Sequence, residues 1–246
     1  MYQALLWNQP LEIETTEGLF SPRGADTGTL SMVSAVELES GQKLLDLGCG
    51  AGLVGIAAAK VGEENVWMTD VDPAAVRCAA ENAKRNGVEN VHLCCGDALD
   101  AVDASGFDWI LSNPPYHADF SVAKKFIEKG FNRLKLGGKL VMVVKRELWY
   151  RNKLTAIFGG VRMQEIGGYF VFTAEKRSER YAPPKPKAPA ISPWTKKQLG
   201  SKPAVPASDY LTRIGSAVEP TAPRRAPVAT TGYVNRIGIA LEAQEA

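Results

Sequence analysis

The chain has 246 residues, which is more than one average domain needs but few for two complete ones, so the length favours one α/β-sized unit with an appendage. The net charge of +2 hides two unlike parts, because the segment from Lys176 onward holds twelve Lys and Arg against five Asp and Glu and leaves an acidic body. The N-terminus has no basic segment leading into an apolar one, and no run is long enough to span a bilayer, so we expect a cytoplasmic protein.

The spacing of cysteine and histidine gives no sign of a metal site. These residues are Cys49, Cys78, Cys94, Cys95, His92 and His117. The cysteines form no Cys-x-x-Cys pair, and the histidines do not have the spacing that completes a zinc site. We therefore expect reduced, buried thiols and no metal.

The N-terminal residues 1–24 are predicted to form a short hairpin followed by a loop. The stretch ALLWNQPLEIETT is typical of a hairpin, and we expect its turn around Asn8-Gln9-Pro10. The next stretch, GLFSPRGADTGT, is predicted to be a loop that enters a helix at about Thr27.

Short apolar strands then alternate with amphipathic or Ala-rich helices. Strands are predicted over residues 43–48, 65–72, 90–95, 107–113 and 137–145, and helices over residues 52–62, 73–87, 120–134 and 147–160. Residues 161–176 are predicted to form two more strands that turn at Gly167-Gly168. This order predicts an α/β, Rossmann-like fold whose seven-stranded, mostly parallel sheet ends in an antiparallel hairpin and carries helices on both faces.

The C-terminal residues 178–246 are predicted to form a largely disordered tail. Ten of the fifteen prolines lie beyond residue 180, and apolar periodicity is weak there. The basic segments KPKAP and PRRAP either attract RNA without sequence preference or belong to a soluble linker.

A glycine-rich turn follows the first strand of the alternating region. Gly48, Gly50 and Gly52 are spaced G-x-G-x-G, so backbone N–H groups can approach a ligand at the start of a helix. Dinucleotide sites use a related pattern, and some such turns only pack a helix on a strand. Asp46, however, would repel a pyrophosphate but suits the sulfonium and ammonium groups of S-adenosylmethionine. The loop therefore favours S-adenosylmethionine over NAD.

Further acids end the next two strands. Asp70 stands where a carboxylate can accept hydrogen bonds from both ribose hydroxyls. Asp72 immediately precedes Pro73, which makes it a candidate helix cap. Asp97 could meet an adenine amino group, although an Asp after Gly is also an ordinary turn residue. Acids at three successive strand ends favour the ligand role.

The fourth strand of this region ends in SNPPYH. Two prolines fix φ and donate no hydrogen bonds, so the carbonyls of Asn113 and Pro114 become rigid acceptors. Together with the side-chain oxygen of Asn113 they could hold an NH₂ group by its two hydrogens, and Tyr116 offers a face for stacking. Asn113, Pro114, Pro115 and Tyr116 thus form a predicted clamp for a planar amine. His117 either orients the substrate or packs the loop.

Two stretches of the body are rich in basic residues. They are VAKKFIEKGFNRLK, residues 122–135, and KRELWYRNK, residues 145–153. Each is either a solvated helix face or part of a nucleic-acid surface, and position in the fold decides between these.

The motifs LDLGCGAG, TDVD, GDAL and SNPPYH together resemble the class I S-adenosylmethionine-dependent methyltransferases that modify exocyclic or amide nitrogens. More narrowly, GLFSPRGADTGT, LDLGCGAG and SNPPYH in this order look like the small domain of bacterial ribosomal RNA guanine-N2 methyltransferases. The methyltransferase domain would cover residues 25–177. The resemblance implies cofactor contacts from Asp46, Gly48, Gly50, Asp70 and Asp97, and acceptor contacts from residues 113–116.

The predicted activity is direct transfer of a methyl group to a planar exocyclic amine. Guanine N2 of ribosomal RNA is the leading substrate, and the same clamp fits the N5 amide of a protein glutamine or adenine N6. A non-catalytic RNA- or protein-binding module of the same fold is the alternative from another class. RNA is the expected partner, and the sequence does not determine the oligomeric state.

Overall fold

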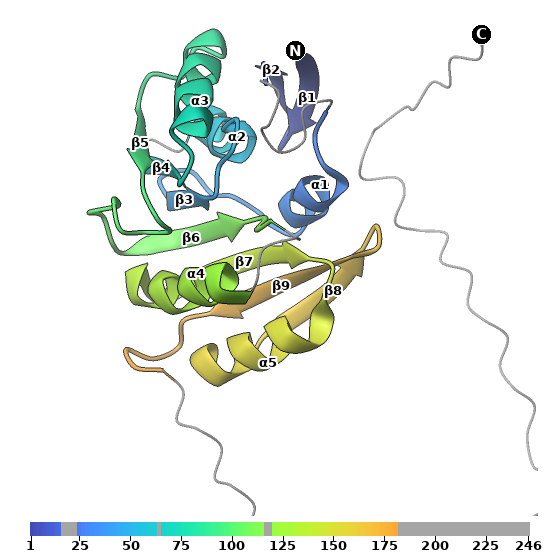
Figure 1. Ribbon diagram of the computed structural model, residues 1–246, viewed down its shortest axis with the longest axis vertical. Helices are drawn as coiled ribbons and strands as arrows, with labels where there is room; N and C mark the ends of the chain where they lie inside the picture. The colour runs from blue at the N-terminus through green and yellow to red at the C-terminus, as the bar shows by residue number, and fades with distance from the viewer. Residues whose placement is uncertain (16–23, 63–64, 116–119, 182–246) are drawn as a thin grey trace, which may run out of the picture. The chain divides into compact units, whose positions relative to one another are not determined.

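A single large sheet organises the part of the chain that the computed structural model describes, residues 1–15, 24–62, 65–115 and 120–181. Its seven strands lie in the order β5-β4-β3-β6-β7-β9-β8 (Figure 1). Their bounds are β3 Lys43–Leu47, β4 Asn65–Asp70, β5 Val91–Cys95, β6 Phe107–Ser112, β7 Leu134–Val144, β8 Arg162–Ile166 and β9 Tyr169–Glu175. Strands β3 to β7 pair in parallel, whereas β9 is antiparallel to both β7 and β8. The predicted fold class is confirmed.

Five helices cover both faces of this sheet in the described part of the chain. They are α1 Thr27–Ser34, α2 Leu53–Val61, α3 Pro73–Arg85, α4 Phe120–Arg133 and α5 Glu147–Phe158. Helices α1, α2 and α3 lie on one face, and α4 and α5 on the other (Figure 1). Each face of the sheet has its own hydrophobic core. Successive side chains of a strand point to opposite faces, so Val141 and Val143 join the core under α1, α2 and α3, while Leu140, Met142 and Val144 join the core under α4 and α5. This explains why the second half of β7, from Leu140 to Val144, is apolar.

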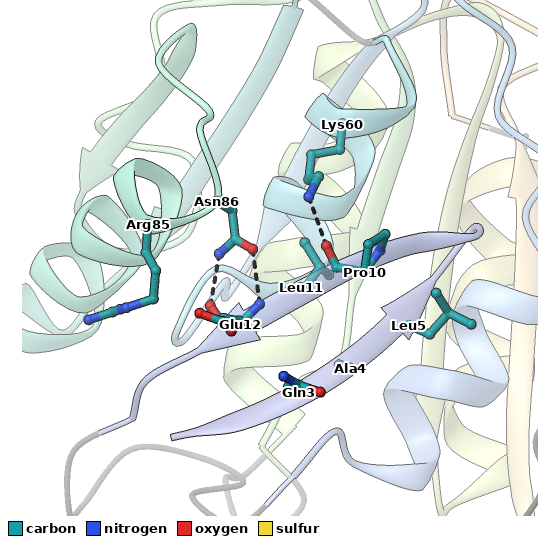
Figure 2. Close-up of a pocket in the computed structure, with 9 residues that line it drawn as sticks. All are labelled: Gln3, Ala4, Leu5, Pro10, Leu11, Glu12, Lys60, Arg85 and Asn86. Carbon is teal, nitrogen blue, oxygen red and sulfur yellow. Dashed lines mark hydrogen bonds between the residues drawn. The ribbon is translucent and has the colours of Figure 1, made fainter.

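The N-terminal hairpin packs on the outside of the α2–α3 layer. Its strands are β1 Tyr2–Leu6 and β2 Gln9–Ile13. Trp7 and Asn8 form the turn with positive φ values of 45° and 61°, so the predicted turn was placed one residue too late, and Pro10 lies within β2. Lys60 donates to the carbonyl of Pro10, and Asn86 exchanges two hydrogen bonds with the backbone of Glu12 (Figure 2).

Three local predictions are corrected. Strand β7 begins at Leu134 instead of residue 137, because the residues after α4 extend the pairing with β6 across a register shift. Strand β4 ends at Asp70, and Asp72 caps α3 by accepting from the N–H of Ala74 at 2.8 Å. All four cysteines are free, as expected, but Cys94 is only partly buried and Cys95 is exposed.

The predicted tail beyond Tyr181 and the loop over residues 16–23 fall outside the described residues. Within the described part, no helix combines the length and the apolar character that a membrane span requires.

Candidate active site

The carboxyl ends of β3, β4, β5 and β6 bring the predicted site residues to one edge of the sheet. Asp46 in β3 pairs with Leu111 in β6, two residues before Gly48 and Asn113 in their respective segments. The hydroxyl of Ser112 donates to the carbonyl of Leu47 at 2.8 Å, which ties the ends of the two strands together. The glycine turn and the Asn-Pro-Pro segment are therefore neighbours, although 65 positions separate Ser112 from Leu47.

Asp46 is a buried carboxyl group beneath the glycine turn. Only 4% of the residue is exposed, and its Oδ2 accepts a hydrogen bond of 2.9 Å from the N–H of Gly55 in α2. The pKa of Asp46 is raised to about 7, mainly by burial; the N–H of Gly55 opposes the shift and nearby Asp70 adds to it. Among the described residues no basic side chain forms a salt bridge with Asp46. A cationic ligand would favour the ionised form of this group.

The glycine turn holds Asp70 in position. The N–H of Gly50 donates to Oδ2 of Asp70 at 2.9 Å, and the N–H of Asp72 donates to Oδ1 at 3.0 Å. Gly48 and Gly50 have φ values of 79° and 53°, which side chains other than glycine adopt at a cost. Among the described residues, no atom lies within 4 Å of a Cβ added to Gly50, so this part of the chain leaves open space above the backbone.

The turn that carries Asp97 is fixed against the end of β4. The N–H of Gly96 donates to the carbonyl of Asp70 at 2.9 Å, and Oγ1 of Thr69 donates to the carbonyl of Ala98 at 3.3 Å. Ala98 has a φ of 59°, an uncommon value for a residue with a side chain. The Asp97 carboxylate forms an ion pair with Lys125 of α4, and both side chains are about half exposed.

Asn113 is oriented by the first turn of α1. Its Nδ2 donates to Oδ2 of Asp26 at 2.9 Å and to Oγ1 of Thr29 at 3.0 Å. Asp26 is also the cap of α1, because the same carboxylate accepts from the N–H of Thr29 at 3.3 Å. These bonds use the side-chain NH₂ group of Asn113, so the side-chain oxygen Oδ1 is the acceptor end of the amide.

The remaining clamp residues are only partly described. Pro114 is buried and Pro115 is exposed. Tyr116 and His117 lie outside the described residues, so their predicted roles stay predictions. Within the described residues no cluster of His, Cys, Asp and Glu could hold a metal ion.

The family model of the methyltransferase small domain matches residues 10–173. The chain belongs to this family. Membership confirms the predicted S-adenosylmethionine-dependent methyltransferase. The match covers most of β2, the glycine turn and the Asn-Pro-Pro segment.

Two relatives show how similar the chain is to individual proteins. It is 32% identical over 180 residues to the uncharacterized protein YbxB of Bacillus subtilis, covering 70% of this chain and 89% of that protein. It is 35% identical over 158 residues to ribosomal RNA small subunit methyltransferase C of Hahella chejuensis, covering 62% of this chain and 46% of that enzyme. The chain spans about half the length of the ribosomal RNA methyltransferases that it matches.

A solved structure shares the fold. The 16S rRNA N2 G1207 methyltransferase RsmC of T. thermophilus, in complex with AdoMet and guanosine, has a TM-score of 0.67 and 27% identity. The match covers 72% of this chain and 50% of that one.

The described residues of this methyltransferase fit the cofactor. Asp46 is a buried acid with no salt bridge in the described part of the chain, Asp70 is preorganised by Gly50, and open space lies above that glycine. Val71 is 69% exposed between Asp70 and Asp72, which provides an apolar surface at the same edge. A ligand that combines cationic groups, a ribose and an apolar ring surface matches these features.

Sequence reasoning missed the residues that hold Asn113. Asp26 and Thr29 contact its amide, and the hydroxyl of Tyr169 lies 3.5 Å from Oδ1 of Asp26. The Asp before TGT was a visible helix-cap signal. The contact of Asp26 and Thr29 with Asn113 could not be predicted from this signal, because it depends on how α1 packs against the end of β6.

A separate surface pocket of about 560 Å³ lies beside the hairpin (Figure 2). It is lined by Gln3, Ala4, Leu5, Pro10, Leu11, Glu12, Lys60, Arg85 and Asn86. None of the predicted site residues contributes to it, so this pocket is distinct from the candidate active site.

Proposed function

We propose that this protein transfers a methyl group from S-adenosylmethionine to guanine N2 of ribosomal RNA. The observation that carries the proposal is the orientation of Asn113, whose NH₂ end is held by Asp26 and Thr29 at the end of β6. Ribosomal RNA methyltransferases among the relatives support the RNA substrate, and the guanosine in the T. thermophilus complex supports the base. Such a substrate would place the reaction in the cytoplasm.

The acceptor end of Asn113 determines what the site can bind. Oδ1 of Asn113 and the backbone carbonyl of Pro114 would each accept one hydrogen of the substrate NH₂ group. An amine conjugated to a ring is a poor nucleophile because its lone pair is delocalised. Two acceptors placed for a pyramidal nitrogen would localise that lone pair toward the methyl donor, and they need no reorganisation during the reaction.

The remaining residues hold and orient the donor. Asp46 would balance the positive charge of the methionine end, Gly48 and Gly50 would let it approach the backbone, and Asp70 would accept from the ribose hydroxyls. Asp97 would meet the adenine amino group, a role that requires the carboxylate to be shared with or released from Lys125. When bound, the cofactor supplies a methyl group already activated on a sulfonium. The methylated nitrogen then loses its proton to water.

The test uses purified protein, methyl-labelled S-adenosylmethionine and small-subunit ribosomal RNA from cells that lack this protein. Label in RNA, digested to N2-methylguanosine, is the expected result. N6-methyladenosine would keep the clamp and overturn the base assignment, while label removed by protease would indicate a glutamine amide. Binding of the cofactor without any transfer would favour the non-catalytic module.

Asn113→Ala provides the matched variant for this assay. We expect at least a hundredfold lower kcat and nearly unchanged cofactor affinity, because Asn113 serves the acceptor. A variant that retains more than a few per cent of the activity would contradict the clamp.

A further inference from the structure

Several cations of the two basic stretches of the body form local ion pairs. In the second stretch, Arg151 pairs with Glu147 and Lys153 pairs with Glu128. On α4, Lys125 and Lys129 form ion pairs with Asp97 and Asp100. Just after α4, Lys135 pairs with Asp108. The first stretch is therefore a face stabilised by local ion pairs, which reduces the charge that it offers to a partner.

The second stretch begins at the edge of the sheet that holds the candidate active site. Lys145 and Arg146 directly follow Val144, the last residue of β7, and both are exposed. Strand β7 pairs in parallel with β6, and Ser112 is the partner of Met142. The two basic residues therefore lie beside the segment that starts with Asn113.

Lys145 and Arg146 lean toward opposite faces of the sheet. Nζ of Lys145 lies 5.1 Å from the ring centre of Tyr169, a residue of the core that includes α1. The guanidinium of Arg146 lies 5.6 Å from the ring centre of Phe120, which packs against the core of α4 and α5. A bound molecule that crosses this edge of the sheet would therefore meet a positive charge on each face of the sheet.

The aromatic contacts limit the freedom of these cations. Phe120 stacks on Trp149 with ring centres 4.3 Å apart, so Arg146 faces an already ordered ring. Leu148, two residues after Arg146, is 70% exposed, and Glu147 forms an ion pair with Arg151. A guanidinium held over a ring loses less entropy when it binds a phosphate.

The basic side chains are also connected to the acceptor residues. Tyr169 lies under Lys145, and its hydroxyl is 3.5 Å from the Asp26 carboxylate that holds Asn113. Lys145 is thus connected through Tyr169 and Asp26 to the place where the acceptor amine would lie.

We propose that Lys145 and Arg146 bind the phosphodiester backbone of RNA on the two sides of the target nucleotide. The inference rests on the proposed function, since it takes the acceptor to be a nucleotide. An enzyme reaches an exocyclic amine on a base that is out of the stack, so the bound segment is unpaired at the target. Phosphates flanking that nucleotide would then pass over the edge between the two cations.

The experiment compares the double variant Lys145→Gln/Arg146→Gln with Arg162→Gln in the full chain. Arg162 is an exposed arginine at the start of β8, which is separated from β7 by β9, and its substitution provides the same loss of charge per residue. The probe is a fluorescent, single-stranded RNA of mixed sequence, titrated between 50 and 250 mM KCl. Methyl transfer to small-subunit ribosomal RNA is measured in parallel.

The double variant is expected to bind the RNA about tenfold more weakly, and the slope of log affinity against log salt should fall by about 1.4. Its KM for RNA should rise while kcat and cofactor affinity stay unchanged, and Arg162→Gln should alter neither slope nor KM. If the double variant and Arg162→Gln have equal RNA affinity and equal salt dependence, Lys145 and Arg146 do not bind the RNA backbone, even where the wild type methylates RNA. If the double variant loses RNA affinity but the wild type methylates no RNA, Lys145 and Arg146 bind RNA and the proposed function is wrong.

Discussion

Asn113 donates a hydrogen bond of 2.9 Å to Asp26 across 87 positions of the chain. The contact joins the end of β6 to the cap of α1, a helix that precedes the whole alternating region. One carboxylate thus serves both the helix and the orientation of the amide that we assign to the acceptor. Loss of Asp26 should therefore separate effects on stability from effects on transfer.

Asp26→Ala should lower kcat by one to two orders of magnitude and leave cofactor affinity unchanged, because Asn113 loses an anchor of its NH₂ end. Loss of the cap should cost about 1 kcal/mol of unfolding free energy. Asp72→Ala is the control, since Asp72 caps α3 without contacting Asn113. Steady-state kinetics at saturating cofactor and urea unfolding provide the measurements. Equal kcat in the two variants would mean that Asp26 acts only through the helix.

Most of the fold could be predicted from the sequence because its elements differ in period and punctuation. Apolar runs such as residues 107–112 are bounded by turn residues, and Pro73 and Gly87 bracket α3. The start of β7 was missed because Lys135, Leu136 and Gly137 carry no apolar run, and pairing with β6 determines the strand there. Tertiary pairing overrides local propensity at such positions.

The position of candidate site residues at one edge of the sheet could be predicted where one strand end carries the whole signal, as at Asp46 or Asn113. Partnerships between distant segments could not. The ion pair of Asp97 with Lys125 depends on how α4 packs beside the turn after β5. The ion pairs of Lys125 and Lys129 on α4 and the exposure of Lys145 and Arg146 at the end of β7 likewise follow only from their neighbours.

Gly50→Ala should weaken cofactor binding by more than tenfold. Its φ of 53° costs an alanine about 1 kcal/mol, and the added methyl would project into the open space that we assign to the cofactor. Gly87→Ala is matched, because Gly87 has a φ of 70° and open space around its Cβ position but lies at the end of α3. Calorimetric titration with S-adenosylhomocysteine distinguishes the two. Similar affinities in both variants would place the ligand elsewhere.

Asn82→Ala should reduce the unfolding free energy by about 2–4 kcal/mol. The amide of Asn82 is fully buried, donates to the carbonyls of Glu14 and Ala51, and accepts from the N–H of Glu14. Its removal takes away the hydrogen bond to the buried carbonyl of Ala51 and the partner of the Glu14 N–H. Asn86→Ala breaks a comparable but exposed pair of bonds to Glu12 and should cost about 1 kcal/mol or less. Urea unfolding measures both losses, and equal values would contradict the role of burial.

The raised pKa of Asp46 predicts how stability depends on pH. The folded state holds a proton on Asp46 up to about pH 7, whereas the unfolded chain releases it near 3.8, the ordinary pKa of an aspartic acid side chain. Between these values the folded state binds more protons, so the contribution of Asp46 to stability falls as pH rises. Asp46→Asn should therefore be more stable than the wild type at pH 8, by up to about 4 kcal/mol, and the difference should vanish toward pH 4.

Cofactor binding should show the opposite preference. A cation beside Asp46 stabilises the carboxylate, so binding releases its proton, and affinity should rise from pH 6 to pH 8 before it levels off. Asp46→Asn should bind more weakly at pH 8 and retain only the pH dependence that comes from the cofactor's own titration. Calorimetry in buffers of different ionisation enthalpy counts the protons released. Identical pH profiles for the wild type and the variant would show that Asp46 does not face the positive charge, and the cofactor would then have to bind in a different orientation at this edge of the sheet.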